Sequence, residues 1–84
     1  MYRALLERRA ERDLKRLPPD VFDRVIEVIK GLEADPRPPG VRKIVGSERD
    51  WRLRVGTYRV IYEIDDASRQ VRVMRVRHRR EAYK

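Results

Sequence analysis

A proline-rich segment separates two halves of the chain that have different hydrophobic patterns. Residues 35–40 read Asp-Pro-Arg-Pro-Pro-Gly, in which the prolines bar a helix and the glycine ends one. Before this segment apolar residues recur at helical spacing, and after it they alternate as they do in strands. We therefore predict an α+β domain: an N-terminal strand, a two-helix hairpin, and then a three- to four-stranded antiparallel sheet whose one face the helices cover.

Each half contains several expected elements. The first half has a strand over 2–7, a helix over 8–17 that two prolines end, and a second helix over 20–34. The strands expected in the second half cover 41–45, 51–55, 58–64 and 69–77. In the last strand Val73 and Met74 are adjacent and apolar, which a bulge or burial on both faces would explain.

The length of 84 residues predicts one domain spanning 1–84. A domain of this size buries only roughly 60% of the surface of its unfolded chain, which leaves surface for a partner to cover. The chain has no cysteine, no apolar segment long enough to span a membrane, and nothing near Met1 that resembles a secretory signal. We expect a cytoplasmic protein without a membrane span.

Net charge is the composition feature that bears most on function. Lys and Arg total 22 against 14 acidic residues, which gives a net charge of +8. A field of this sign attracts nucleic acid or an acidic protein. A well-solvated surface rich in arginine is the alternative explanation.

Gly56-Thr57 separates two alternating segments and indicates a two-residue hairpin turn. In the resulting register Arg54 faces Arg59, and Arg52 lies two residues away on the same face. We expect the Arg59 side chain to project from this face into solvent. The opposite face carries the side chains that would pack on the helices: Trp51, Leu53, Val55, Tyr58, Val60 and Tyr62.

Arginines that oppose each other directly in a sheet cost stability, roughly 0.2–1 kcal/mol per pair. Anion binding explains the arrangement better, because guanidinium groups donate to phosphate oxygens in a bidentate fashion. The alternative is a solvated face whose charges are balanced by Glu48, Asp50 or Glu63.

The last eight residues add chemistry of a different kind. Three arginines accompany the only histidine, His78, and a tyrosine, Tyr83. Tyrosine can stack on an unpaired base, and histidine can move a proton near neutral pH. A frayed basic end is the alternative. One histidine without cysteine cannot form a transition-metal site in a single chain, so we expect no metal and no cofactor.

Four segments together resemble the RelE family of toxin–antitoxin systems, within the RelE/ParE superfamily. They are Lys43–Gly46, Trp51–Gly56, Tyr58–Ile64 and His78–Tyr83, and the likeness covers nearly the whole chain. The central segments are typical of the superfamily. The basic last segment with its tyrosine is typical of RelE rather than of ParE-like gyrase poisons.

This resemblance implies a ribosome-dependent, metal-independent endoribonuclease that cuts mRNA in the A site and contacts ribosomal RNA. In such enzymes the ribose 2′-hydroxyl attacks the adjacent phosphate and leaves a cyclic phosphate and a 5′-hydroxyl. A cognate antitoxin is the implied protein partner, with an acidic, partly disordered segment that folds onto the basic surface. A ParE-like inhibitor of gyrase that binds without cleaving RNA is the alternative.

The resemblance also implies residue roles by position. Arg52 and Arg54 match the family's basic pair, and Arg59 matches its phosphate-binding arginine. Arg79 matches the basic residue near the leaving oxygen, and Tyr83 matches the tyrosine that stacks on the substrate. We expect further RNA contacts from three basic side chains, Lys43, Arg77 and Arg80.

One departure from the family concerns the general base. The best-known RelE has lysines at the positions of Arg52 and Arg54, and one of them has been assigned this role. Arginine does not deprotonate in proteins, so it cannot act in the same way. The base could be His78, Lys43 or Tyr83, or the ribosome could position the reacting groups.

Overall fold

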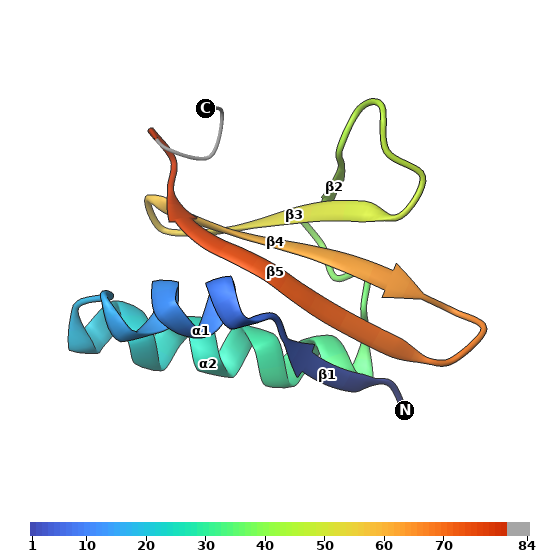
Figure 1. Cartoon of the computed structure of the whole chain (residues 1–84), viewed down its shortest axis with the longest axis horizontal. Helices are drawn as coiled ribbons and strands as arrows, with labels where there is room; N and C mark the ends of the chain where they lie inside the picture. The colour runs from blue at the N-terminus through green and yellow to red at the C-terminus, as the bar shows by residue number, and fades with distance from the viewer. Residues whose placement is uncertain (81–84) are drawn as a thin grey trace.

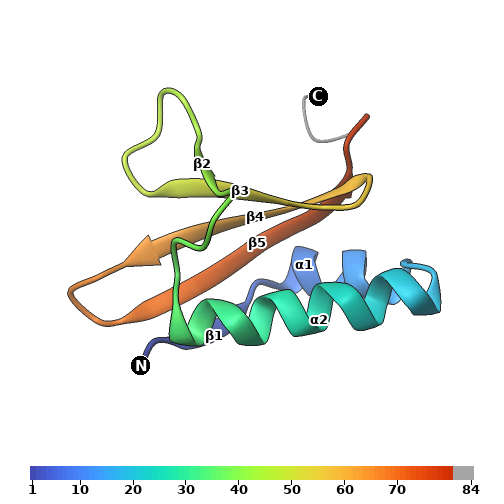
Figure 2. The same cartoon turned by 180° about the vertical axis from the view of Figure 1, so that it is seen from behind.

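In the computed structural model, which describes residues 1–80, two helices cover one face of a five-stranded sheet (Figures 1 and 2). The chain first forms β1 (Arg3–Leu6), α1 (Arg8–Lys15) and α2 (Pro19–Ala34). Four strands follow: β2 (Arg42–Lys43), β3 (Asp50–Val55), β4 (Tyr58–Asp65) and β5 (Gln70–His78). The predicted α+β class and the predicted order of elements are confirmed.

The strands lie in the order β1-β5-β4-β3-β2. β1 pairs in parallel with β5, with Arg3 opposite Gln70, and the other neighbouring strands are antiparallel. The N-terminal strand thus joins the sheet, although it is far from β5 in the sequence. At the other edge β2 has only two residues instead of the five expected over 41–45.

The core lies between the two helices and the sheet, and α1 contributes Ala10 and Leu14 to it. α2 begins at Pro19 rather than Asp20, because proline suits the first turn of a helix, where its missing N–H leaves no hydrogen bond unmade. Its buried stripe consists of Val25, Ile29 and Leu32, at helical spacing. The sheet contributes side chains that alternate along β3, β4 and β5: Leu53, Val55, Val60, Tyr62, Ile64, Val71, Val73 and Val76.

The predicted irregularity in β5 is a β-bulge that changes which side chains reach the open face, the face away from the helices. Ile61 pairs with Arg75 and Tyr62 pairs with Val73, so Met74 is the extra residue. A strand without this bulge would turn Arg77 toward the helices, because side chains alternate with a period of two. The bulge instead places Arg77 opposite Arg59 on the open face.

Asp13 of α1 holds β5 in place where β1 no longer pairs with it. Its carboxylate accepts hydrogen bonds at 2.9 Å from Arg75 Nε and from the Val76 backbone N–H. Hydrogen bonds to a charged group in a partly buried position contribute about 1.5–3 kcal/mol. This contact fixes the part of β5 that leads to Arg77.

Candidate functional site

The hairpin of β3 and β4 has the predicted register. Arg54 pairs with Arg59, and Arg52 lies two residues along β3 on the same face. Gly56 has a positive φ of 61°, and Thr57 does not, which fits a two-residue turn of type II′ with glycine first. The sequence-predicted arginine face is therefore present in the fold.

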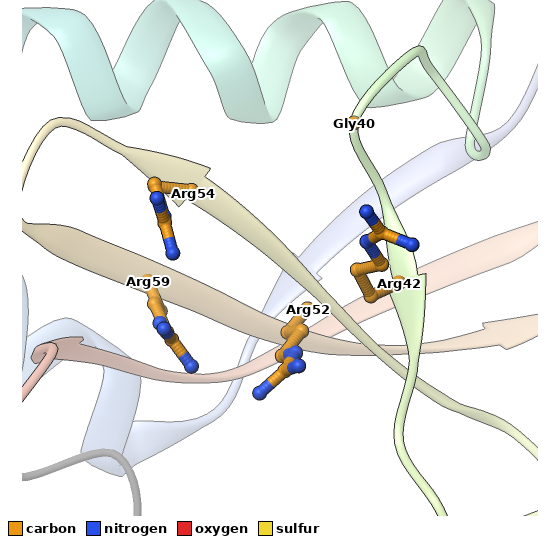
Figure 3. Close-up of a pocket in the computed structure, with 5 residues that line it drawn as sticks. All are labelled: Gly40, Arg42, Arg52, Arg54 and Arg59. Carbon is orange, nitrogen blue, oxygen red and sulfur yellow. The ribbon is translucent and has the colours of Figure 1, made fainter.

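These arginines line a pocket of about 310 Å³ on the open face (Figure 3). Gly40, from the proline segment, and Arg42, from β2, complete the lining. Figure 3 shows the guanidinium groups of Arg52 and Arg59 pointing toward one another, with that of Arg54 beside Arg59. Such a group of planar donors suits an anion with several oxygen atoms, phosphate above all.

The expectation that Arg59 projects into solvent is wrong. Only 7% of Arg59 is exposed, because β4 is the central strand of the sheet and the side chain lies between Arg54 and Arg77. A side chain on the open face was expected to be solvated, but Arg59 lies on a strand that has a neighbour on each side, and little of it is exposed. The buried stem also means that truncation to alanine would remove packing as well as charge.

Burial is the largest cause of a lowered pKa for the Arg59 guanidinium. Three positively charged neighbours lower it further: Arg52, Arg54 and Arg79. Positive groups gathered at a partly desolvated position interact unfavourably with one another and favourably with a bound anion. The structure therefore concentrates positive potential at Arg59.

Arg79 belongs to this site although β5 ends one residue earlier. Its backbone N–H donates to the Thr57 carbonyl at 2.7 Å, which continues the pairing of β5 with the hairpin turn. Its charge is close enough to lower the pKa of Arg59. Of the residues predicted for the site, the structure thus brings together Arg52, Arg54, Arg59, Arg77 and Arg79.

His78 lies on the helix side of the sheet, away from the arginine pocket. It pairs with Tyr58, and their rings meet edge to face with centroids 5.3 Å apart. Its Nδ1 accepts a hydrogen bond from the Arg80 backbone N–H at 3.3 Å. A proton-transfer role for His78 stays a prediction and requires the substrate to reach around the end of β5. Tyr83 lies outside the described residues, so its predicted role is untested.

Sequence reasoning selected Lys43 from the edge strand but missed its neighbour Arg42. Lys43 pairs with Trp51, and its Nζ lies 6.0 Å from the centre of the Trp51 ring, on the helix side. Arg42 pairs with Arg52 and therefore lies on the open face, where it lines the pocket. Only the register of β2 against β3 distinguishes the two, and no turn signal in the sequence fixes that register.

Acidic side chains that could balance the arginine face lie at its far end. Asp50 and Glu63 oppose each other four residues along the strands from Arg54 and Arg59. Three ion pairs lie elsewhere among the described residues: Arg37 with Asp66, Arg72 with Glu7, and Arg75 with Asp13.

Other kinds of site find no support in the part of the chain that the structure describes. Residues 1–80 contain no group of three or more His, Cys, Asp or Glu side chains placed to hold a metal ion. None of the helices in this part is both long and apolar enough to cross a membrane.

Comparison with known proteins gives consistent matches over nearly the whole chain. Residues 4–83 match the family model of the ParE toxin of type II toxin–antitoxin systems, parDE. The chain is 38% identical over 79 residues to Toxin RelG of Mycobacterium tuberculosis, covering 89% of this chain and 87% of that protein. It is 30% identical over 82 residues to the putative toxin RelE1 of Methanocaldococcus jannaschii, covering 94% and 91%.

Solved structures of toxin–antitoxin complexes share the fold. The RelBE2 complex of Mycobacterium tuberculosis matches with a TM-score of 0.81 and 32% identity, over 92% of this chain and 96% of the matched chain. The archaeal RelE–RelB complex of Pyrococcus horikoshii matches with a TM-score of 0.84 and 28% identity, over 96% and 98%.

Proposed function

The chain belongs to the ParE toxin family of type II toxin–antitoxin systems, in the RelE/ParE superfamily, and we propose that it is a RelE-type endoribonuclease that cuts messenger RNA in the ribosomal A site. The observation that carries the proposal is the pocket in which Arg52, Arg54 and Arg59 converge. Both curated relatives are named as Rel toxins. A toxin that acts on the ribosome acts in the cytoplasm.

The chemistry is an internal transfer of a phosphoryl group. The ribose 2′-oxygen forms a bond to the adjacent phosphorus, and the bond from phosphorus to the 5′-oxygen breaks. The products are a 2′,3′-cyclic phosphate and a 5′-hydroxyl, so the 2′-hydroxyl loses one proton and the leaving oxygen gains one. No water, metal or cofactor enters this balance.

Arginines can supply the electrostatic part of this reaction. The phosphate gains negative charge in the transition state, and fixed donors aimed at that charge lower the barrier. We assign this role to Arg54 and Arg59, with Arg52 holding the same phosphate from the next position along β3. Arg79 is assigned to the leaving oxygen.

Proton transfer needs a different group, because guanidinium groups stay charged. His78 or Tyr83 is proposed for this role, and stacking by Tyr83 would also hold the nucleotide in line for attack. Lys43, Arg77 and Arg80 are proposed to contact the surrounding message and ribosomal RNA.

The structural matches to RelE–RelB complexes support a cognate antitoxin as the protein partner. The arginine face is positively charged and can therefore bind an acidic segment of that partner. Such a segment would cover the arginines of the pocket and so exclude the RNA phosphates.

A ParE-like inhibitor of gyrase is the second candidate, because the family model that matches is that of ParE. Adding the purified protein to a translation system and mapping the 5′ ends of the message separates the two. Cuts in phase with codons, suppressed by prior addition of the cognate antitoxin, are the expected result. An intact message together with blocked supercoiling by gyrase would replace the first proposal with the second.

A further inference from the structure

Arg42 forms a wall of the pocket that is separate from the other arginines. It lies on β2 directly opposite Arg52, and its side chain is exposed. Figure 3 shows the guanidinium of Arg42 turned toward Gly40, whereas those of Arg52 and Arg59 extend the other way. The pocket therefore presents positive charge in two directions.

Arg42 and Arg59 lie well apart in the sheet. Arg42 is two strands away from Arg59 and two residues further along. With about 4.8 Å between strands and about 3.4 Å per residue, the two Cα atoms are about 12 Å apart. With the Arg42 side chain turned away, a phosphate held by Arg54 and Arg59 lies out of its reach.

We propose that the pocket binds two consecutive phosphates of a single RNA strand, one at Arg54 and Arg59 and the next at Arg42. Arg52 lies between these two subsites, since it pairs with Arg42 and is two residues from Arg54. Gly40 lines the pocket at the Arg42 end. This inference rests on the proposed function for the identity of the strand, but it is tested by binding alone.

The test compares two probes that cannot be cleaved because they lack the 2′-hydroxyl. A deoxydinucleotide carries one internucleotide phosphate and a deoxytrinucleotide carries two. In an NMR titration of the wild-type protein we expect the trinucleotide to bind about five- to tenfold more tightly, the effect of one added charge-assisted contact. Arg42→Ala should remove this preference and leave dinucleotide binding nearly unchanged.

Matched variants separate a direct contact from general charge. Arg12→Ala removes the same charge from an exposed position on α1, on the helix side of the sheet, and should keep the preference for the trinucleotide. Arg42→Lys should retain part of the preference for the trinucleotide, because lysine keeps the positive charge. The salt dependence of trinucleotide binding should fall by about 0.7 in slope for Arg42→Ala, the value for one phosphate contact to a single strand.

Three results would overturn the two-phosphate site. They are equal binding of the two probes to the wild type, equal loss of both probes in Arg42→Ala, and the same loss of preference in Arg12→Ala. The wild type could prefer the trinucleotide, and Arg42→Ala could lose this preference, while the message stays intact in the translation system. In that case the proposed function fails and the two-phosphate site stands.

Discussion

We expect Arg59 to lower the free energy of unfolding although it is needed to bind phosphate. Replacing Arg59 with methionine tests this expectation. In register Arg59 faces Arg54 on one side and Arg77 on the other. Each directly opposed like-charge pair costs roughly 0.2–1 kcal/mol, so relieving two of them should stabilise the fold by about 0.4–2 kcal/mol. Methionine keeps the length of the apolar stem and therefore most of its packing.

The sign follows from the pKa of Arg59, which lies below its ordinary value because of burial and positive neighbours. A positive group with a lowered pKa destabilises the folded state wherever it stays protonated, and this includes neutral pH. The gain from methionine should therefore be present at pH 7. It should shrink in 1 M salt, where the screening length falls to about 3 Å.

Urea unfolding at pH 7, in low salt and in 1 M salt, measures the gain. Arg54→Met serves as a comparison, because Arg54 is exposed and its replacement removes only one opposed pair. We expect this variant to be stabilised by about 0.2–1 kcal/mol. The same Arg59→Met protein should cut RNA about 10²–10³ times more slowly in the translation system. An Arg59→Met protein less stable than the wild type in low salt would refute the electrostatic reasoning, and undiminished cleavage would remove Arg59 from the site.

Three further changes test other parts of the molecule. His78→Ala should slow single-turnover cleavage, because the proposed proton transfer is lost, and Tyr83→Phe should be mild; full activity of the first variant with none of the second would assign proton transfer to Tyr83. Tyr62→Phe should lower the free energy of unfolding by about 1–3 kcal/mol, because the buried Pro36 carbonyl loses its hydrogen bond; an unchanged urea midpoint would contradict this. Asp66 has a pKa of about 2, chiefly because Arg37 donates hydrogen bonds to its carboxylate, so the stability that this carboxylate contributes should be lost as the pH falls from about 4 to 2. The Asp66→Asn protein should therefore lose less stability than the wild type over that pH range. Equal losses in the two proteins would contradict a stabilising role of the Asp66 carboxylate.

The arginine face could be predicted from the sequence because it depends on a local rule. A two-residue turn at Gly56-Thr57 sets which residues of β3 and β4 oppose each other, and alternation then assigns their faces. The adjacent apolar pair Val73-Met74 likewise indicated either a bulge or burial on both faces, and β5 has the bulge. Both signals lie within a few residues of the structure that they predict.

What the sequence determined by itself was the set of elements, the α+β class and the identity of the three pocket arginines on the hairpin. Tertiary structure decided the features that depend on distant pairing or on neighbours. The parallel pairing of β1 with β5 and the register that selects Arg42 over Lys43 join segments with no local signal between them. Burial of Arg59 follows from its place on the central strand of the sheet. The position of His78 on the helix side follows from the bulge in β5, which shifts the alternation of side chains by one residue. Alternation gives the face on which a side chain lies, but only the packed sheet determines what covers it.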